Sequence, residues 1–141
     1  MRFRGTYNHT VDSKGRVSLP AKFRKVLPEN VVVVPGFRNA LYVFTEEDFD
    51  MWVDSLFNRG DETFDPVSRQ NVFMRKKINN SAEDVNVDAA GRIKMSASLR
   101  EKAKIDKDVY IVGDQDHIEI WDCNTYDEEM SKFSLDDFLE D

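Results

Sequence analysis

The sequence predicts a mainly β protein with short helices, an α+β fold built from two similar halves. The motif VDSKGRVSLPAKFR at 11–24 returns as VDAAGRIKMSASLR at 87–100, and short β-rich runs alternate with brief helical patterns in both halves. With one residue added in the second copy, the similarity extends over about forty residues of each half. So small a unit cannot bury an adequate core alone. The two copies are therefore expected to pack as a pseudo-two-fold barrel of interleaved hairpins, with helices at its periphery.

Each copy is expected to contain the same elements in the same order. In the first copy, strands are expected at 6–11, 16–19, 31–34 and 40–44, with a short helix at 21–27. In the second copy, the corresponding segments are strands at 83–87, 92–95, 109–112 and 117–121, with a helix at 97–103. A further helix is expected to close each copy.

Capping residues and apolar spacing predict where these helices lie. Pro20 suits the first position of the helix at 21–27, and Ser96 is a candidate N-cap for the helix at 97–103. Thr45 followed by Asp48 resembles a capping box at the start of the first closing helix. One apolar face is then expected on each closing helix, formed by Phe49, Trp52, Val53 and Leu56 in the first copy and by Tyr126, Met130 and Phe133 in the second.

The repeat also divides the chain into segments. Residues 1–57 form the first repeat with its closing helix, and residues 81–133 form the second. The connector at 58–80 carries a helix of its own, whose start is marked by Asp65-Pro66. Residues 134–141 form an acidic C-terminal tail.

Composition limits the class of protein. Of the 141 residues, 40% are hydrophobic and 33% charged, as in globular proteins, and no apolar run approaches the ~20 residues of a membrane span. The start MRFRGTYNHT has no apolar core typical of a signal peptide. The single cysteine, Cys123, excludes an internal disulfide. A cytoplasmic protein is therefore expected.

Charge is unevenly distributed along the chain, whose net charge is −7. The segments that contain the repeated motif are positive, with +5 over 1–35 and +4 over 68–110. The segments that follow are negative, with −6 over 36–67 and −10 over 111–141. Local charge guides a polyanion more than total charge does. A cationic surface near the motif is thus compatible with a nucleic-acid partner, although charge blocks can also simply solvate a surface.

The repeated turn supplies the candidate site. Asp12 and Asp88 are expected to accept hydrogen bonds from backbone N–H groups of the turn, and Gly15 and Gly91 to adopt positive φ. Arg16 and Arg92 follow each turn and either pair with the aspartates or project outward, where an arginine fork suits phosphates and guanine edges. More cations surround the first turn than the second, namely Lys14, Lys22, Arg24 and Lys25, where the second copy has Ala90, Ser98, Arg100 and Glu101.

DSKGRVSLPAKFR and DAAGRIKMSASLR resemble the D-x-x-x-R region of AbrB-type swapped-hairpin DNA-binding proteins. Two copies in a chain of this length, opened by FRGTYNHTVDSKGRVSLP, resemble the MraZ family over nearly the whole chain. The resemblance implies a transcriptional regulator that binds short direct repeats in double-stranded DNA. These repeats would lie upstream of the division and cell-wall gene cluster that includes its own gene.

The resemblance also implies assembly into a homo-oligomeric ring and association with the nucleoid. It assigns DNA contact to Arg16, and Arg92 occupies the same place in the second copy, although Ala89-Ala90 there lacks an equivalent of Lys14. Arg4 lies at a position where the family is basic. The expected DNA-binding set is therefore Arg4, Lys14, Arg16, Lys22, Arg24 and Lys25, with Arg92 and Arg100 as further candidates.

Other chemistries find little support in the sequence. His9, His117 and Cys123 do not have metal-ligand spacing and are interpreted as strand histidines and a core cysteine. Asp114 and Asp116 flank a hairpin turn and are interpreted as turn formers. No nucleophile motif or phosphate loop is present, so no enzyme, cofactor or small-molecule ligand is expected. Two alternatives remain open, an AbrB-type antitoxin or protein-interaction module and a ring-forming assembly protein without DNA sequence preference.

Overall fold

The computed structural model describes residues 2–58 and 68–140. The first copy contains β1 (Phe3–Thr10), β2 (Arg16–Ser18), α1 (Ala21–Arg24), β3 (Asn30–Pro35), the 3-10 helix η1 (Phe37–Asn39), β4 (Leu41–Phe44) and α2 (Glu46–Phe57). After α3 (Arg69–Ser81), the second copy contains β5 (Glu83–Asn86), β6 (Arg92–Lys94), α4 (Ala97–Lys102), β7 (Asp108–Gln115), β8 (His117–Asp122) and α5 (Cys123–Met130). A last helix, α6 (Leu135–Glu140), ends the described chain.

The two copies exchange their first strands. β1 of the first copy pairs with β7 of the second, and β5 of the second copy pairs with β3 of the first. The resulting six-stranded antiparallel sheet has the order β1-β7-β8-β4-β3-β5, which is symmetric about the β8–β4 pair. The predicted α+β class with interleaved hairpins is confirmed.

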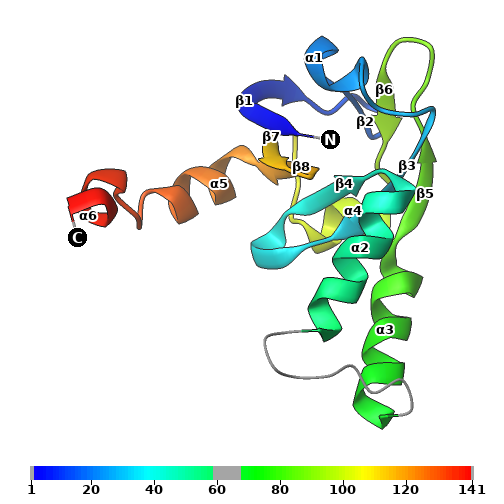
Figure 1. Cartoon of the computed structure of the whole chain (residues 1–141). Helices are drawn as coiled ribbons and strands as arrows, with labels where there is room; N and C mark the ends of the chain where they lie inside the picture. The colour runs from blue at the N-terminus through cyan, green and yellow to red at the C-terminus, as the bar shows by residue number, and fades with distance from the viewer. Residues whose placement is uncertain (1, 59–67, 141) are drawn as a thin grey trace.

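A separate ribbon joins the two repeated motifs (Figure 1). β2 pairs with β6 antiparallel, and Val17 faces Ile93 at its centre. Both side chains are fully buried in the main core, together with the matching pairs Leu19 and Met95, Phe23 and Leu99. This core draws on both copies, which is why a single copy has too little apolar surface to fold alone.

A second core lies on the other face of the sheet, beneath α2. Thr45 Oγ1 accepts a hydrogen bond from the Asp48 N–H at 3.1 Å, which confirms the predicted cap. Phe49 and Val53 are buried and Trp52 packs against them, so the predicted apolar face is confirmed at these three residues. The fourth predicted residue, Leu56, is outside this core, and Phe57 packs against it instead.

Three local predictions need correction. Pro20 is the N-cap of α1 rather than its first residue, and the two short helices end earlier than expected, at Arg24 and Lys102. The apolar face expected on the second closing helix is wrong beyond Tyr126, because α5 extends past the sheet and leaves Met130 and Phe133 exposed. The predicted start of the connector helix at Asp65-Pro66 lies outside the described residues.

The C-terminal helices point away from the body (Figure 1). Within the described ranges, no helix combines the length and the apolar character needed to cross a bilayer.

Candidate nucleic-acid interface

The first turn is organised by the carboxylate of Asp12. Its Oδ1 accepts hydrogen bonds from the N–H groups of Lys14 and Arg16, both at 2.9 Å. Its Oδ2 accepts a hydrogen bond from Arg16 Nε at 2.8 Å. The sequence left open whether Arg16 pairs with the aspartate or projects outward. It does both, because pairing with Asp12 fixes the direction in which the guanidinium leaves the turn.

The second turn has the same geometry. Asp88 Oδ1 accepts from the N–H groups of Ala90 and Arg92 at 2.9 Å, and Oδ2 accepts from Arg92 Nε at 2.9 Å. The backbone hydrogen bond from Arg92, followed by those from its side chain and from Ala90, lowers the pKa of Asp88. The bonds from Arg16 and Lys14 lower the pKa of Asp12 in the same way, so both carboxylates are charged at neutral pH.

The glycines of both turns adopt the conformation predicted for them. Gly15 has φ +80° and Gly91 has φ +78°, a region that residues with a Cβ rarely occupy. Each turn also contacts the opposite copy, because Met95 N–H donates to Gly15 O at 2.8 Å and Leu19 N–H donates to Gly91 O at 2.9 Å. The two turns are thus joined by the β2–β6 ribbon.

The ribbon has one apolar face and one polar face. Successive side chains of a strand point to opposite faces, so burial of Val17 and Ile93 directs their neighbours to the other side. These neighbours are Arg16, Ser18, Arg92 and Lys94. Register places Arg16 opposite Lys94 and Ser18 opposite Arg92.

Lys94 was not among the predicted site residues. Its equivalent in the first copy is Ser18, which carries no charge, so the repeat alignment gave no reason to select it. The alternation I-K after the second turn is the only sequence signal that would have placed Lys94 beside Arg16.

The two arginines keep part of their hydrogen-bonding capacity. Each uses Nε to bind its aspartate, and within the described ranges neither Arg16 nor Arg92 donates a hydrogen bond from its terminal nitrogens. These side chains remain about one-third exposed, at 28% and 34%. The Nη1–Nη2 edge of each guanidinium is therefore available to a bidentate acceptor such as a phosphate or a guanine edge.

Arg24 and Arg100 each cover one of the two turns and donate a hydrogen bond to a backbone carbonyl beside it. Arg24 Nη1 donates to Ala90 O at 2.8 Å, and its side chain lies over Gly91, where a Cβ would overlap it. Arg100 Nε donates to Met95 O at 3.1 Å, and its guanidinium lies over Gly15. Each arginine thus comes from the helix of one copy and covers the turn of the other.

The remaining predicted cations all belong to the first copy. Lys14, in the first turn, and Lys22 and Lys25, at α1, are exposed and have no ion pair in the described ranges. Arg4 is also exposed, is the second residue of β1 and lies opposite Asp114 of β7. Its neighbour Phe3 packs edge-on against Phe23 of α1, with ring centroids 5.4 Å apart. The start of β1 therefore lies beside α1.

A histidine and carboxylates meet elsewhere, at the β7–β8 hairpin. His117 Nδ1 lies 2.9 Å from Asp116 Oδ1 and His117 Nε2 lies 2.8 Å from Glu119 Oε2, while Trp121 Nε1 donates to Glu119 Oε1 at 2.7 Å. Asp114 lies close to this pair. One carboxylate oxygen each of Asp114 and Glu119 and one ring nitrogen of His117 lie within 4.8 Å of one another. Burial would lower the pKa of His117, but the hydrogen bonds to Glu119 and Asp116 outweigh it and raise that pKa.

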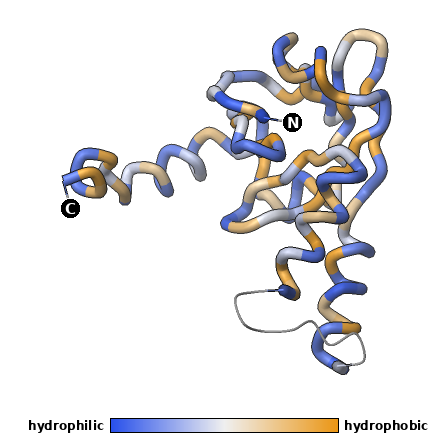
Figure 2. The backbone as a smooth tube through the Cα atoms, in the orientation of Figure 1, coloured by the Kyte–Doolittle hydropathy of each residue, from blue (hydrophilic) through white to orange (hydrophobic). Residues whose placement is uncertain are grey.

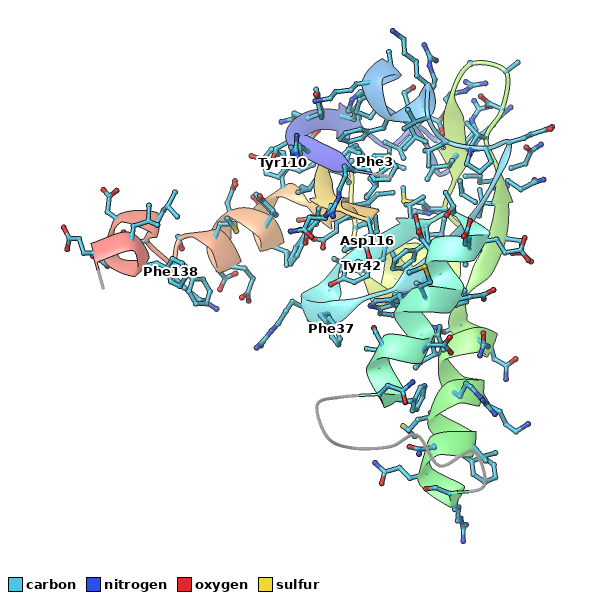
Figure 3. The ribbon with its side chains drawn as sticks, viewed as in Figure 1. Phe3, Phe37, Tyr42, Tyr110, Asp116 and Phe138 are labelled. Atoms are coloured by element: carbon cyan, nitrogen blue, oxygen red, sulfur yellow. The ribbon has the colours of Figure 1, made fainter. Side chains whose placement is uncertain are left out.

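The cluster is an imidazole held between two carboxylates, one at each ring nitrogen. The imidazole also packs at a tilt against Tyr42, with ring centroids 4.4 Å apart, and against Phe44 at 5.2 Å. Tyr42 and Asp116 are labelled in Figure 3. Both ring nitrogens are occupied by carboxylates, so the sequence interpretation of a strand histidine holds, and Asp116 binds the histidine besides flanking the turn. The interpretation of Cys123 as a core cysteine is wrong, because Cys123 is the first residue of α5, is only half-buried and lies outside the core.

Two interlocked β units, joined through a ribbon that displays a pair of Asp–Arg turns, define a swapped-hairpin protein. Comparison with known families narrows this class. The model of the family described as "MraZ protein, putative antitoxin-like" matches residues 2–65 and 79–141. The chain belongs to the MraZ family.

Curated relatives are similar in sequence to this chain over most of its length. One from Mesoplasma florum, named Transcriptional regulator MraZ, is 37% identical over 128 residues, covering 90% of this chain and 84% of the relative. Another of the same name from Lachnoclostridium phytofermentans is 35% identical over 144 residues, covering 94% of this chain and 98% of the relative. These names describe regulators and not enzymes.

Proposed function

We propose that this protein is a sequence-specific DNA-binding transcriptional regulator. The observation that carries the proposal is the pair of arginines held by Asp12 and Asp88 with their terminal nitrogens left for a ligand. Holding a side chain in place before binding reduces the entropy lost on binding. The names of the relatives support the same function.

We assign different roles to the cations around the ribbon. Arg16 and Arg92 would read base edges or clamp phosphates, and Lys94 would contact the backbone beside Arg16. Lys14, Lys22 and Lys25 would add phosphate attraction that weakens with salt. Arg24 and Arg100 would act by supporting the turns, and Arg4, beside the residue that packs on α1, would add a further phosphate contact.

The finer proposal concerns the operator and the assembly. The protein would bind short direct repeats upstream of the division and cell-wall gene cluster, including its own gene, and would associate with the nucleoid. Assembly as a homo-oligomeric ring would present several ribbons at once, which raises avidity when the DNA repeats match the spacing of subunits.

The test compares binding of wild type and variants to the protein's own upstream DNA and to a scrambled duplex across a salt series. Arg16→Ala is expected to lose about 5- to 150-fold of the preference for its own DNA, the value of one bidentate base contact. Arg92→Ala tests the second turn. Lys22→Gln is expected to weaken binding to both duplexes and to reduce the salt slope by about 1.

Arg38→Gln, which removes an exposed cation of η1 outside the ribbon, is the matched control. Light scattering confirms that every variant keeps the wild-type mass. Wild type that binds both duplexes equally, or Arg16→Ala that keeps the preference, would contradict sequence reading by the ribbon and favour an assembly or interaction protein.

A further inference from the structure

Beyond Asp127, which lies near Tyr110, the rest of α5 and all of α6 form an apolar and acidic arm, residues 128–140, that joins neither core of the described residues. Five large apolar side chains of the arm are more than half exposed, namely Met130, Phe133, Leu135, Phe138 and Leu139. Acidic residues lie between them, and the segment 123–140 contains six carboxylates and a single lysine, Lys132. Figure 2 shows these hydrophobic stretches on a part of the chain that extends away from the body.

Exposed apolar groups at this density mark an interaction surface. Phe138 is 77% exposed and points from the arm without contacting the body (Figure 3). Among the described residues no core cluster includes any of the five. No described residue of the chain covers them, so a second copy is a candidate to remove them from water.

A complementary surface lies on α3. This helix carries Arg69, Arg75, Lys76 and Lys77 and has no acidic residue. Arg69, Phe73, Lys76 and Lys77 follow one another at helical spacing on its exposed side, and we call them the α3 stripe. Phe73 is 53% exposed in the middle of the stripe.

The α3 stripe is hollowed on both sides of Phe73. One shallow hollow of about 560 Å³ is lined by Arg69, Gln70, Phe73 and Lys77. A second of about 450 Å³ shares Phe73 and Lys77 and extends to Lys102. Arg69, Lys76 and Lys77 have no ion pair within the described ranges. An apolar centre with a cationic rim fits a segment that offers apolar side chains between carboxylates.

In Figure 1, α5 and α6 extend to the left of the body, whereas α3 lies at its lower right. We propose that the arm of one subunit docks on the α3 stripe of the next, with the phenylalanines of α5–α6 against Phe73 and the acidic residues against the stripe's cations. A contact between two different surfaces of the same chain repeats head to tail, and it closes into a ring where the rotation allows. This inference rests on the ring assembly proposed above and supplies its contact.

Light scattering after size exclusion tests the contact. The double variant Phe133→Ser with Phe138→Ser removes apolar side chains of the arm. The double variant Phe73→Ser with Lys77→Glu removes the apolar centre of the stripe and reverses one of its charges. All four side chains are exposed, so the fold should survive, as circular dichroism would verify. Each double variant is expected to require at least ~30-fold more protein to assemble, the effect of losing one interface hot spot. Met51→Ser, which replaces an exposed methionine of α2 (64%), is the control and should match wild type.

Mixing the two double variants provides a sharper result. Each retains one intact surface, so a 1:1 mixture is expected to form heterodimers of twice the chain mass and nothing larger. Reversed charges should also restore assembly, because Asp136→Lys with Asp137→Lys on the arm complements Lys76→Glu with Lys77→Glu on the stripe.

The failures are distinguishable. A monomeric wild type overturns the proposed ring together with this contact. An assembled wild type whose double variants assemble equally well overturns only the contact. A stripe variant that assembles normally but loses DNA affinity shows that the α3 stripe faces DNA, which also overturns it. An unrelated protein on the arm would leave mixing and charge reversal without effect, and that too would overturn the contact.

Discussion

A carboxylate and a guanidinium four residues apart define the chemistry of each turn. The Asp12 carboxylate binds two backbone N–H groups and still holds Arg16, so one side chain both closes the turn and aims the arginine. A lysine could not replace Arg16 here, because it has a single nitrogen and could not bind Asp12 while presenting a two-donor edge.

The His117 cluster gives stability a particular pH dependence. Because the folded pKa of His117 is raised, its contribution is present in full below the unfolded pKa of about 6.5 and is lost as pH rises through the folded pKa. We expect His117→Gln to destabilise the protein more at pH 6 than at pH 9, measured as the difference in melting temperature from wild type at each pH.

His9 provides the control for this measurement. Burial lowers the pKa of His9, so the stability linked to it rises with pH, and His9→Gln is expected to show a pH trend of opposite sign. An effect of His117→Gln that is equal at both pH values would mean that the histidine contributes packing on Tyr42 and Phe44 but no charge.

At the scale of elements, the turns and the short helices that cover them act as one unit. Arg24 of α1 covers the second turn, and Arg100 of α4 covers the first. Neither helix has many residues, so each is held mainly by this contact and by its one buried apolar residue, Phe23 or Leu99.

Alanine at the turn glycines tests this unit. Gly15→Ala places a Cβ 2.9 Å from the carbonyl oxygen of Met95, and Gly91→Ala displaces the Arg24 side chain. Both residues have positive φ, so each variant is expected to lose about 1–2 kcal/mol of unfolding free energy from backbone strain alone. We expect Gly15→Ala to lose more, because a backbone carbonyl yields less than an arginine. Urea denaturation measures both, and equal or negligible losses would contradict the close packing of turn and ribbon.

For the whole molecule, the exchange of strands makes folding a property of both copies together. β1 finds its eight register partners in β7, and β5 finds its four in β3. The main core likewise takes Val17 from one copy and Ile93 from the other.

Fragments 1–58 and 68–141 therefore should not fold separately as monomers. Each is expected to give the circular dichroism of an unfolded chain, and mixing them should restore the spectrum of the intact protein. The uncut chain at the same concentration is the control. A fragment that folds by itself as a monomer would contradict the exchange of strands.

The sequence alone predicted the doubling, the positions of nearly all strands and the Asp-x-x-Gly-Arg turns. These features depend on local preferences, since glycine permits positive φ, aspartate caps turn N–H groups and alternating β-branched residues favour strands. The family resemblance, carried by the same residues, was confirmed by the comparisons.

The tertiary structure decided which distant residues meet. It placed Lys94 beside Arg16, laid Arg24 over Gly91, enclosed His117 between carboxylates and left Phe133 in water where the repeat predicted a packed face. None of this follows from local preference, because pairing between strands far apart in the chain depends on register and on the fit of the whole core. Two copies of nearly the same motif therefore acquired different surroundings only when they folded together.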